Sequence, residues 1–479
     1  MASLTDREID AIARRIVANI GPGSGPTATP QAEDQPSAGT GVYGTVDEAV
    51  QAARGAQPAF ARLPLKTRAQ IIASIRRTMI DHAAALAKAA HEETGLGRIE
   101  DKVVKNLLVT EKTPGVEDLG PQAVTGDHGL SLIEPAPFGV IGAITPVTNP
   151  TSTIICNAIG MLAAGNAVVF NVHPSARRCS IQTVALLNVA IRAAGGPQDV
   201  VTCVEHPTIE TAQEMMRHRG IRLLVVTGGG AVVKAAMASG KRAICAGPGN
   251  PPVVVDETAH IDKAGRDIVL GASTDNNIIC TDEKEVLVVS SVADALIRAM
   301  TAAGAVLLEK AQLAALEQLV FAGTEGPRRP AHVNKDLIGK NAGVILRRLG
   351  MNVPESVRLA IVEVDESHPL LWTEQMMPVL PICRVAHVDA AIDLAVQVEG
   401  GNRHTAVMHS TNIDSLSRMA RECDCSIFVK NGRSQAGLGL DGEGFASFTI
   451  ASPTGEGLTG PRSFSRWRRC VMVDHFRIT

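Results

Sequence analysis

The chain has 479 residues, a length that exceeds one ordinary hydrophobic core and predicts two or three domains. Hydrophobic residues make up 45% and charged residues 20% of the sequence, which is the balance of a soluble globular protein. The formal net charge of -3 and the lack of any apolar run of about 20 residues argue against nucleic acid and membrane as partners.

Residues 1–20 are predicted to form a short amphipathic helix, in which Thr5 can cap the first turn with Glu8 three residues later. The apolar stripe of this helix includes Ile9, Ile12, Ile16 and Ile20. Residues 21–40 are rich in Gly, Pro, Ser and Thr and predict a flexible linker. Because so short a helix is only marginally stable alone, its apolar face has to be buried against another surface. The linker favours a partner protein over the chain's own body as that surface. The segment lacks the features of a secretion signal, so the protein is expected in the cytoplasm.

From Val46 onward, helical patterning gives way to apolar strand-like runs that alternate with helices, which predicts a parallel sheet in an α/β fold. Most of the candidate buried strands are followed by Gly, Pro or Asn. These strands span residues 139–144, 167–171, 200–204, 223–226 and 252–255. A second set of α/β elements runs from Glu285 to about Met408, and the sequence shows no internal repeat.

Nine cysteines are scattered along the chain. The only close pair, Cys423 and Cys425, has no set of Cys or His residues nearby to complete a zinc site, so no metal is predicted. Cys280 lies on an apolar stretch that follows a helix-like segment and polar amides. A lone cysteine is more often a buried structural residue than a nucleophile, so its role depends on the segments around it.

Three upstream segments carry strand ends that turn into helices, namely residues 144–152, 165–171 and 226–230. Strand ends of this kind are where α/β proteins bind ligands. None of them has the GxGxxG pattern of the dinucleotide fingerprint, and each alone is ordinary turn chemistry. Their order along the chain, followed by Cys280 and then by residues 374–379, is the informative feature.

This order and its approximate spacing resemble the aldehyde dehydrogenase superfamily over nearly the whole chain after Thr40. Within that superfamily, residues 145–150 and the loop 246–250 are most similar to the coenzyme A-acylating propionaldehyde and acetaldehyde dehydrogenases of bacterial microcompartments. The resemblance implies an α/β aldehyde dehydrogenase fold with a Rossmann-like cofactor domain, an α/β catalytic domain and a β-hairpin arm for oligomerisation. A homodimer or homotetramer is expected.

The resemblance also divides the chain into five parts. They are an amphipathic encapsulation helix at 1–20, a flexible linker at 21–40, a cofactor-binding domain at 41–248 with an arm segment near 125–138, a catalytic domain at 249–440, and a C-terminal segment with the oligomerisation arm at 441–479. The first helix is expected to bind a shell protein and to direct the enzyme to the lumen of a bacterial microcompartment.

Carried over residue by residue, the resemblance makes Cys280 the nucleophile and Asn149 the side-chain donor to the oxyanion. The NAD-binding residues that it implies are Thr145, Pro146, Asn171, Thr227, Gly228, Gly229 and Glu374. The chemistry suits these residue types, because a thiolate attacks an aldehyde well and leaves well from the resulting thioester. Asn171 replaces the lysine that reaches the adenosine ribose in hydrolytic relatives, which leaves the choice between NAD and NADP open.

The loop 246–249 reads Ala-Gly-Pro-Gly where hydrolytic relatives carry Glu-Leu-Gly-Gly. Water therefore lacks its general base, and a thiol such as coenzyme A is expected to take the acyl group. The function implied is the reversible NAD-dependent oxidation of a short aldehyde to its acyl-coenzyme A, with propionaldehyde favoured over acetaldehyde.

Two alternatives stay open. One is a non-acylating aldehyde dehydrogenase or a relative similar to glutamyl-phosphate reductase, and the other is a non-catalytic cargo or scaffold protein of a microcompartment. His404, on a glycine-rich turn, is expected to have a structural role and is left out of the catalytic set. The basic cluster at 467–469 falls where the family has its arm, which favours an interface.

Overall fold

A computed structural model describes residues 40–478, so the predicted helix at 1–20 and nearly all of the linker lie outside the described residues. The chain forms two compact units. The first contains the described residues up to Glu93 together with Val103–Ala246 and the segment from Phe445 onward, and the second contains Thr94–Lys102 and Gly247–Gly444. Within residues 40–478, no helix combines the length and apolar character that crossing a membrane requires.

The first unit is built on a six-stranded parallel sheet with the order β1-β6-β5-β4-β7-β8. Its strands are β1 (Val42–Tyr43), β4 (Val140–Ile144), β5 (Ala167–Asn171), β6 (Val201–Val204), β7 (Leu223–Thr227) and β8 (Ala243–Ala246). Every residue of β4 and β5 is buried, as expected for strands covered on both faces. The chain runs outward from β4 through β5 to β6 and then returns to the other side of β4, so the strand order reverses between β4 and β7. Ligands of open α/β sheets bind beyond the carboxyl ends of the strands at such a reversal.

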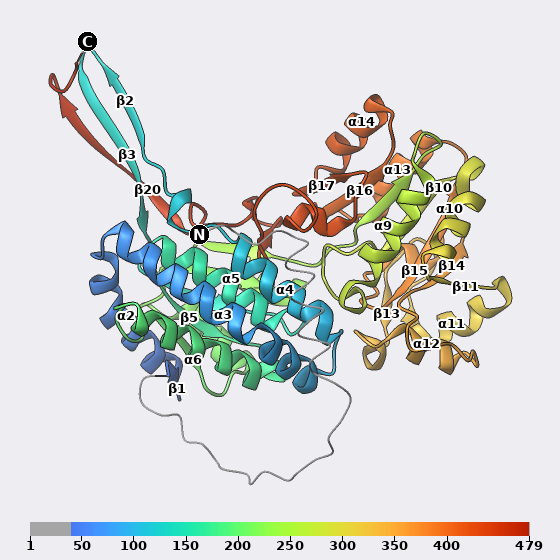
Figure 1. The fold of residues 1–479 in the computed structure, drawn as a ribbon, viewed down its shortest axis with the longest axis horizontal. Helices are drawn as coiled ribbons and strands as arrows, with labels where there is room; N and C mark the ends of the chain where they lie inside the picture. Colours follow the sequence, from blue (N-terminus) through green and yellow to red (C-terminus); the bar gives the residue numbers. More distant parts are fainter. Residues whose placement is uncertain (1–39, 479) are drawn as a thin grey trace, which may run out of the picture. The chain divides into compact units, whose positions relative to one another are not determined.

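Helices pack on this sheet (Figure 1). They are α2 (Val46–Ala61), α5 (Pro150–Ala163), α6 (Arg177–Ala193), α7 (Ile209–Arg217) and α8 (Gly230–Met237). Two further helices of this part of the chain are α3 (Leu65–Thr94) and α4 (Ile99–Lys112). Helix α2 begins at a capping box, in which the Thr45 hydroxyl and the Glu48 carboxylate each accept a backbone N–H of the other residue. This cap fixes the start of α2, which packs on β4, β5 and β6.

A three-stranded antiparallel sheet extends from the first unit, with the order β2-β3-β20 (Figure 1). Its strands are β2 (Gln122–Gly126), β3 (Gly129–Pro137) and β20 (Ser465–Val473). The segment near 125–138, predicted as part of an arm, contains all of β3, and β20 comes from the predicted C-terminal arm. Val124, Val471 and Val473 are all more than half exposed on this sheet. A short β18 (Ile450–Ala451) and β19 (Gly457–Leu458) pair also belongs to the first unit.

The second unit has a seven-stranded parallel sheet with the order β11-β14-β15-β10-β9-β16-β17. Its strands are β9 (Pro252–Val255), β10 (Glu285–Val289), β11 (Val306–Leu308), β14 (Ala360–Val364), β15 (Val379–Val385), β16 (Thr405–His409) and β17 (Ile427–Lys430). Its helices are α9 (Ile261–Ser273), α10 (Ser290–Ala302), α11 (Leu313–Val320), α12 (Ala342–Arg348), α13 (Val388–Val398) and α14 (Ile413–Cys423), and a small hairpin is formed by β12 (Phe321–Thr324) and β13 (Ala331–Val333).

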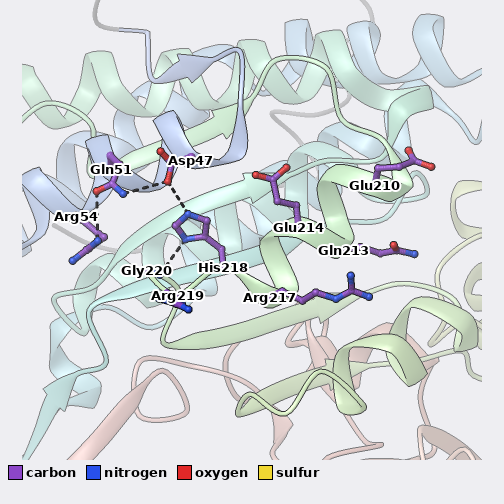
Figure 2. Close-up of a pocket in the computed structure, with 10 residues that line it drawn as sticks. All are labelled: Asp47, Gln51, Arg54, Glu210, Gln213, Glu214, Arg217, His218, Arg219 and Gly220. Atoms are coloured by element: carbon purple, nitrogen blue, oxygen red, sulfur yellow. Dashed lines mark hydrogen bonds and ion pairs between the residues drawn. The ribbon is translucent and has the colours of Figure 1, made fainter.

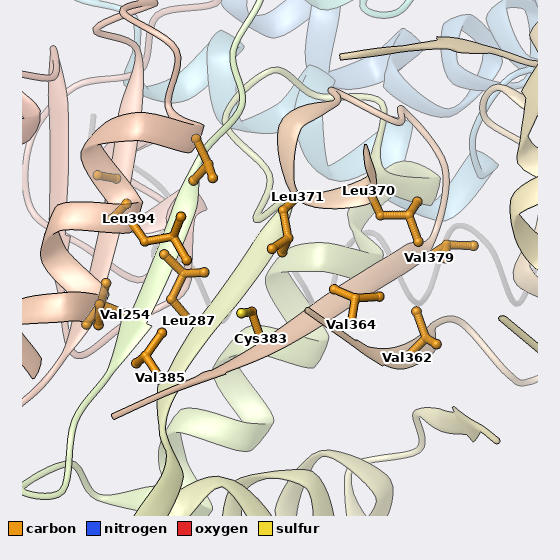
Figure 3. Close-up of a cluster of buried hydrophobic side chains, with 14 of the residues drawn as sticks. Val254, Leu287, Val362, Val364, Leu370, Leu371, Val379, Cys383, Val385 and Leu394 are labelled. Atoms are coloured by element: carbon orange, nitrogen blue, oxygen red, sulfur yellow. The ribbon is translucent and has the colours of Figure 1, made fainter. Parts of the chain in front are cut away.

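The core of the second unit follows from the strand register. Val254, Leu287 and Cys383 are direct neighbours across β9, β10 and β15, so their side chains share one face of the sheet. Figure 3 shows them buried together with Leu394 of α13, which covers this face. The α/β fold class expected from the sequence is confirmed in both units.

The two compact units are not continuous in sequence, unlike the domains expected at 41–248 and 249–440. Those domain boundaries stay predictions. Residues 94–102 lie within the predicted cofactor domain, but in the structure they group with the second unit. The physical reason is an ion pair in which Lys102 Nζ lies 2.9 Å from Asp275 Oδ2, with both side chains almost completely buried. A buried ion pair of this kind is costly to break, so it binds the start of α4 to the second unit.

Candidate active site

Cys280 follows a turn with an unusual backbone. After α9 ends at Ser273, the residues Asp275, Asn276 and Asn277 have φ angles of 45°, 58° and 65°. Asp and Asn tolerate left-handed backbone better than other non-glycine residues, but usually as single residues, so three in succession persist only if other contacts hold them.

Those contacts come from segments far apart in the sequence. Besides its bond to Lys102, Asp275 accepts the backbone N–H of Arg98 at 2.6 Å, and the Arg98 guanidinium donates to Asn276 Oδ1 at 2.8 Å. The Asn276 amide donates in turn to Gly339 O at 2.8 Å. The turn before Cys280 is therefore a fixed platform, which is what a positioned nucleophile requires.

Lys284 supports the same turn from the other side of Cys280. Its side chain is completely buried, and Nζ donates to Asn277 O and Asn277 Oδ1 at 2.7 Å and to Ile279 O at 3.1 Å. Three donors and three acceptors satisfy the ammonium group. The backbone that leads into Cys280 is thus held by a buried positive charge.

The Cys280 thiol is protonated in this state. Desolvation and the nearby Glu374 carboxylate raise the pKa of Cys280 to about 12, although the Lys284 ammonium acts in the opposite direction. Burial also raises the pKa of Glu374, and Lys284 again opposes the shift. Because the thiolate is the nucleophile, attack by Cys280 requires the loss of this proton.

Gly249 allows a close approach beside Cys280. A Cβ atom at this position would lie 2.5 Å from Cys280 O and 2.9 Å from His404 Cγ, so only glycine fits. The Gly249 N–H donates to Glu374 Oε1 at 3.4 Å. The glycine thus places the cysteine backbone, the His404 ring and the Glu374 carboxylate around one point of the second unit.

His404 is completely buried, and its two ring nitrogens differ in their hydrogen bonding. Nδ1 lies 2.9 Å from Thr405 Oγ1, whereas Nε2 has no hydrogen-bond partner within the described residues. Burial and the Lys284 charge lower the pKa of His404 to about 4, so the ring is neutral at physiological pH. A neutral ring with an open nitrogen can accept a proton, a capacity that goes beyond the structural role expected from the sequence. In the sequence, the glycine-rich turn before His404 was the feature that drew attention to this residue.

The first unit carries Asn149 and most of the predicted cofactor-binding residues. Asn149 is the N-cap residue of α5, yet its buried side chain makes no capping hydrogen bond. Its Oδ1 accepts from Lys105 Nζ at 2.6 Å, and its Nδ2 donates to Thr148 Oγ1 at 3.2 Å. The amide is therefore fixed by α4 and not by the helix that it begins.

The residues predicted to line the cofactor gather at the reversal of strand order. Thr145 and Pro146 follow β4, Thr227 ends β7, and Gly228 and Gly229 lead into α8. The buried Thr145 hydroxyl has no partner within residues 40–478, which leaves it open to a ligand. Two glycines at a helix N-terminus give a backbone that a phosphate can approach closely. This arrangement fits a dinucleotide.

Asn171 and Glu374 complete the predicted cofactor set. Asn171 ends β5, next to β4, and its Oδ1 accepts the Thr211 hydroxyl of α7 at 2.7 Å. Its side chain is thus already engaged with the protein. Glu374 belongs to the second unit, so the predicted site residues are divided between the two units, with Cys280 and Glu374 on the second.

A surface pocket in the first unit does not carry the predicted chemistry (Figure 2). It is lined by residues of α2, of α7 and of the turn after α7. Two of its side chains are hydrogen-bonded to each other, with His218 Nε2 2.9 Å from Asp47 Oδ1. None of the predicted site residues lines it. Among the described residues, no cluster of His, Cys, Asp and Glu could hold a metal ion.

Comparison with known proteins places the chain in a family. The model of the aldehyde dehydrogenase family matches residues 36–440. The acetylating acetaldehyde dehydrogenase EutE of Salmonella typhimurium is 52% identical over 91% of this chain and 93% of its own length. The structure of Rhodopseudomonas palustris propionaldehyde dehydrogenase with bound CoA and an acylated cysteine is 50% identical, with a TM-score of 0.88 over 91% of this chain and 98% of that chain.

A third relative comes from a microcompartment. The propionaldehyde dehydrogenase of the Clostridium phytofermentans fucose utilisation bacterial microcompartment is 46% identical, with a TM-score of 0.89 over 92% of this chain and 100% of that chain. These likenesses extend over both units and include the strand ends from which the sequence prediction was made. The chain belongs to the aldehyde dehydrogenase family.

Proposed function

We propose that this enzyme oxidises a short aldehyde with NAD and transfers the acyl group to coenzyme A. The observation that carries the proposal is the combination of a rigidly held Cys280 with a neutral, open His404 beside the same glycine. A nucleophile and a proton acceptor are present, whereas Ala246 stands where hydrolytic relatives have their glutamate. The names of the relatives, one acetylating and one seen with bound CoA, support the same reaction.

In the oxidation, the partly exposed Cys280 thiol releases its proton to solvent water. The resulting thiolate attacks the aldehyde carbon, and the carbonyl oxygen becomes an oxyanion. The Asn149 amide and the backbone N–H of Cys280 donate to this oxygen, a contribution worth about 3 kcal/mol for one donor in other enzymes. When bound, NAD accepts the hydride, and a thioester on Cys280 remains. Thr145, Pro146, Thr227, Gly228 and Gly229 would hold the dinucleotide at the reversal of strand order, and Glu374 its nicotinamide ribose.

In the transfer, a thiol and not water attacks the thioester. Ala246 ends β8 and brings no carboxylate to activate water, which costs hydrolysis about 10²–10⁴-fold. His404 Nε2 accepts the proton of the coenzyme A thiol, so that the thiolate displaces the Cys280 sulfur. The products are the acyl-coenzyme A and a regenerated cysteine.

The test is the formation of NADH from two-, three- and four-carbon aldehydes, with and without coenzyme A. We expect sustained NADH formation only with coenzyme A, and the highest kcat/KM for propionaldehyde or acetaldehyde. The resemblance on which the prediction rests favours the former, and the relatives include enzymes named for each. Sustained NADH formation and free acid without coenzyme A would favour a hydrolytic enzyme, and no NADH under any condition would favour a scaffold.

We also infer that residues 1–20 direct the enzyme into a bacterial microcompartment by binding a shell protein. The support is the isoleucine stripe of this segment, the Gly- and Pro-rich linker behind it and the microcompartment origin of one relative. An apolar stripe of this size suits a groove on a helical partner, and several copies in one enzyme would strengthen a weak contact. Enclosure would keep a reactive aldehyde away from the cytoplasm.

Residues 1–40 fused to a fluorescent protein should concentrate in shells in a cell that makes them. The same fusion with Ile12→Glu and Ile16→Glu should stay diffuse, because the apolar stripe is lost. Fluorescence microscopy of both fusions decides the matter. Equal distribution of the two fusions would contradict the inference.

We infer finally that the β2-β3-β20 sheet joins subunits into a dimer or tetramer. Both outer strands, β2 and β20, have a free edge within the described chain, and apolar side chains such as Val471 are exposed on them. Light scattering of the purified enzyme tests this, and a monomer would contradict it.

A further inference from the structure

Lys105 of α4 lies at a buried position, where a lysine is uncommon and needs an explanation. Its side chain is almost completely buried, and a buried ammonium group is costly unless it is hydrogen-bonded. Nζ donates to Asn149 Oδ1 at 2.6 Å and lies 3.5 Å from Thr148 O, so it serves the residues that open α5. Charge-assisted hydrogen bonds of this length are among the strong ones in proteins.

This contact settles which way the Asn149 amide faces. An ammonium group has three donors and no acceptor, so the atom 2.6 Å from Nζ has to be the amide oxygen. The amide nitrogen is then on the other side of the group. One of its two hydrogens goes to Thr148 Oγ1, and the second is left to donate to a bound carbonyl oxygen.

The start of helix α5 gives an independent indication that Lys105 controls the orientation of the Asn149 amide. Asparagine is a favoured N-cap residue because its side-chain oxygen accepts a backbone N–H of the first turn, which is worth about 1 kcal/mol. Asn149 is the N-cap of α5 and makes no such bond, because Lys105 holds the oxygen. The next residue of α4, Asn106, accepts the Thr151 hydroxyl of α5 at 2.8 Å, so two successive residues of α4 bind the start of α5. These helices lie beside each other in Figure 1.

We propose that Lys105 is the positioning residue of the oxyanion donor, holding the Asn149 amide with its nitrogen turned to the reacting oxygen and polarising the amide through its carbonyl. The proposal rests on the function proposed above for Asn149. A hydrogen bond to the carbonyl of an amide makes its N–H groups better donors, because hydrogen-bonded groups polarise one another. Without the ammonium group, the amide can rotate and turn its oxygen to the oxyanion, which would repel it.

The experiment is a double-mutant cycle in the full-length enzyme, with Lys105→Met and Asn149→Ala made separately and together. We expect each single variant to lose about 10²-fold in kcat for NADH formation with aldehyde and coenzyme A, which is the scale of one oxyanion donor. The double variant should lose no more than Asn149→Ala alone, since Lys105 acts only through that amide. The dissociation constant of NAD should change less than about twofold, because binding is not the step affected.

Lys102→Met is the matched control, because it removes a second buried lysine from the same helix, one bonded to Asp275 and not to Asn149. Its effect on kcat should add to that of Asn149→Ala. If Lys105→Met does not fold, Lys105→Gln keeps an N–H donor without the charge and enters the same cycle with a smaller expected loss.

An unchanged kcat for the Lys105 variant, or a loss that adds fully to that of Asn149→Ala, would overturn the proposal while leaving the role of Asn149 intact. Full activity of Asn149→Ala alone would remove the oxyanion role of Asn149 and the proposal with it. The two failures are thus distinguishable.

Discussion

Cys280→Ala should abolish aldehyde oxidation and leave folding and NAD binding nearly unchanged. The thiol forms the bond to the substrate, and the methyl group of alanine cannot take its place. The backbone before it is held by hydrogen bonds that Lys102, Arg98 and Lys284 make to Asp275 and Asn277, so the turn does not depend on the thiol. The measurements are NADH formation, NAD binding by fluorescence titration and the thermal midpoint of unfolding.

Three other cysteines provide controls for this variant. Cys156, Cys245 and Cys383 are all buried in strands or helices and are expected to contribute to packing alone. Their replacement by alanine should lower stability and spare most of kcat. More than a few per cent of wild-type activity in the Cys280→Ala enzyme would refute the assignment of the nucleophile.

His404→Gln should separate the two halves of the reaction. The oxidation step does not use His404 in the proposed mechanism, so one NADH should form rapidly at each active site. Transfer to coenzyme A should then fall by about 10²–10⁴-fold, the usual contribution of a general base. Because burial lowers the pKa of His404 to about 4, the ring is unprotonated at neutral pH, and transfer should decline only as the pH falls toward that pKa.

His409 is a matched control for this variant. It ends β16, the strand that begins directly after His404, its pKa is likewise lowered to about 4 by burial, and its Nε2 has no partner within the described residues. His409→Gln should therefore show any general effect of replacing a buried histidine next to this strand's ends but should retain transfer. Multiple turnovers in His404→Gln at the wild-type rate would show that another group accepts the thiol proton.

The sequence predicted those parts of the molecule that local pattern determines. Strands such as β4 and β5 are continuous apolar runs followed by turn residues, and they appear within a residue or two of their expected positions. Thr145, Thr227 and Gly228 were assigned through resemblance, and the observed strand order gives the physical reason that they cluster, because β4 and β7 are adjacent. Fold and family were therefore accessible from the chain alone.

The contacts that hold the reacting groups in position could not be predicted in this way. Asp275, Asn276 and Asn277 read as a polar stretch, and nothing local shows that three left-handed residues are held there by Arg98 and Lys102. Contacts between residues so far apart in the sequence depend on the packing of the whole unit. The same holds for Lys105 and Asn149, which are paired only after α4 packs beside α5.

His404 shows a different limit of prediction from sequence. Its position on a glycine-rich turn was visible, but a histidine becomes a base only through its surroundings. Burial, the Lys284 charge and the unpartnered Nε2 decide its state, and these are properties of the folded chain. A residue type and its neighbours in sequence could not distinguish a structural role from a chemical one.

In the proposed reaction, the acyl group passes through Cys280 on its way to coenzyme A. The most direct test is mass spectrometry of the enzyme after reaction with propionaldehyde and NAD, before and after the addition of coenzyme A. We expect one propionyl group per chain, located by peptide mapping on Cys280, and its complete conversion to propionyl-coenzyme A when coenzyme A is added. An enzyme that turns over without ever carrying the acyl group on Cys280, or that releases it as free acid, would contradict this reaction sequence.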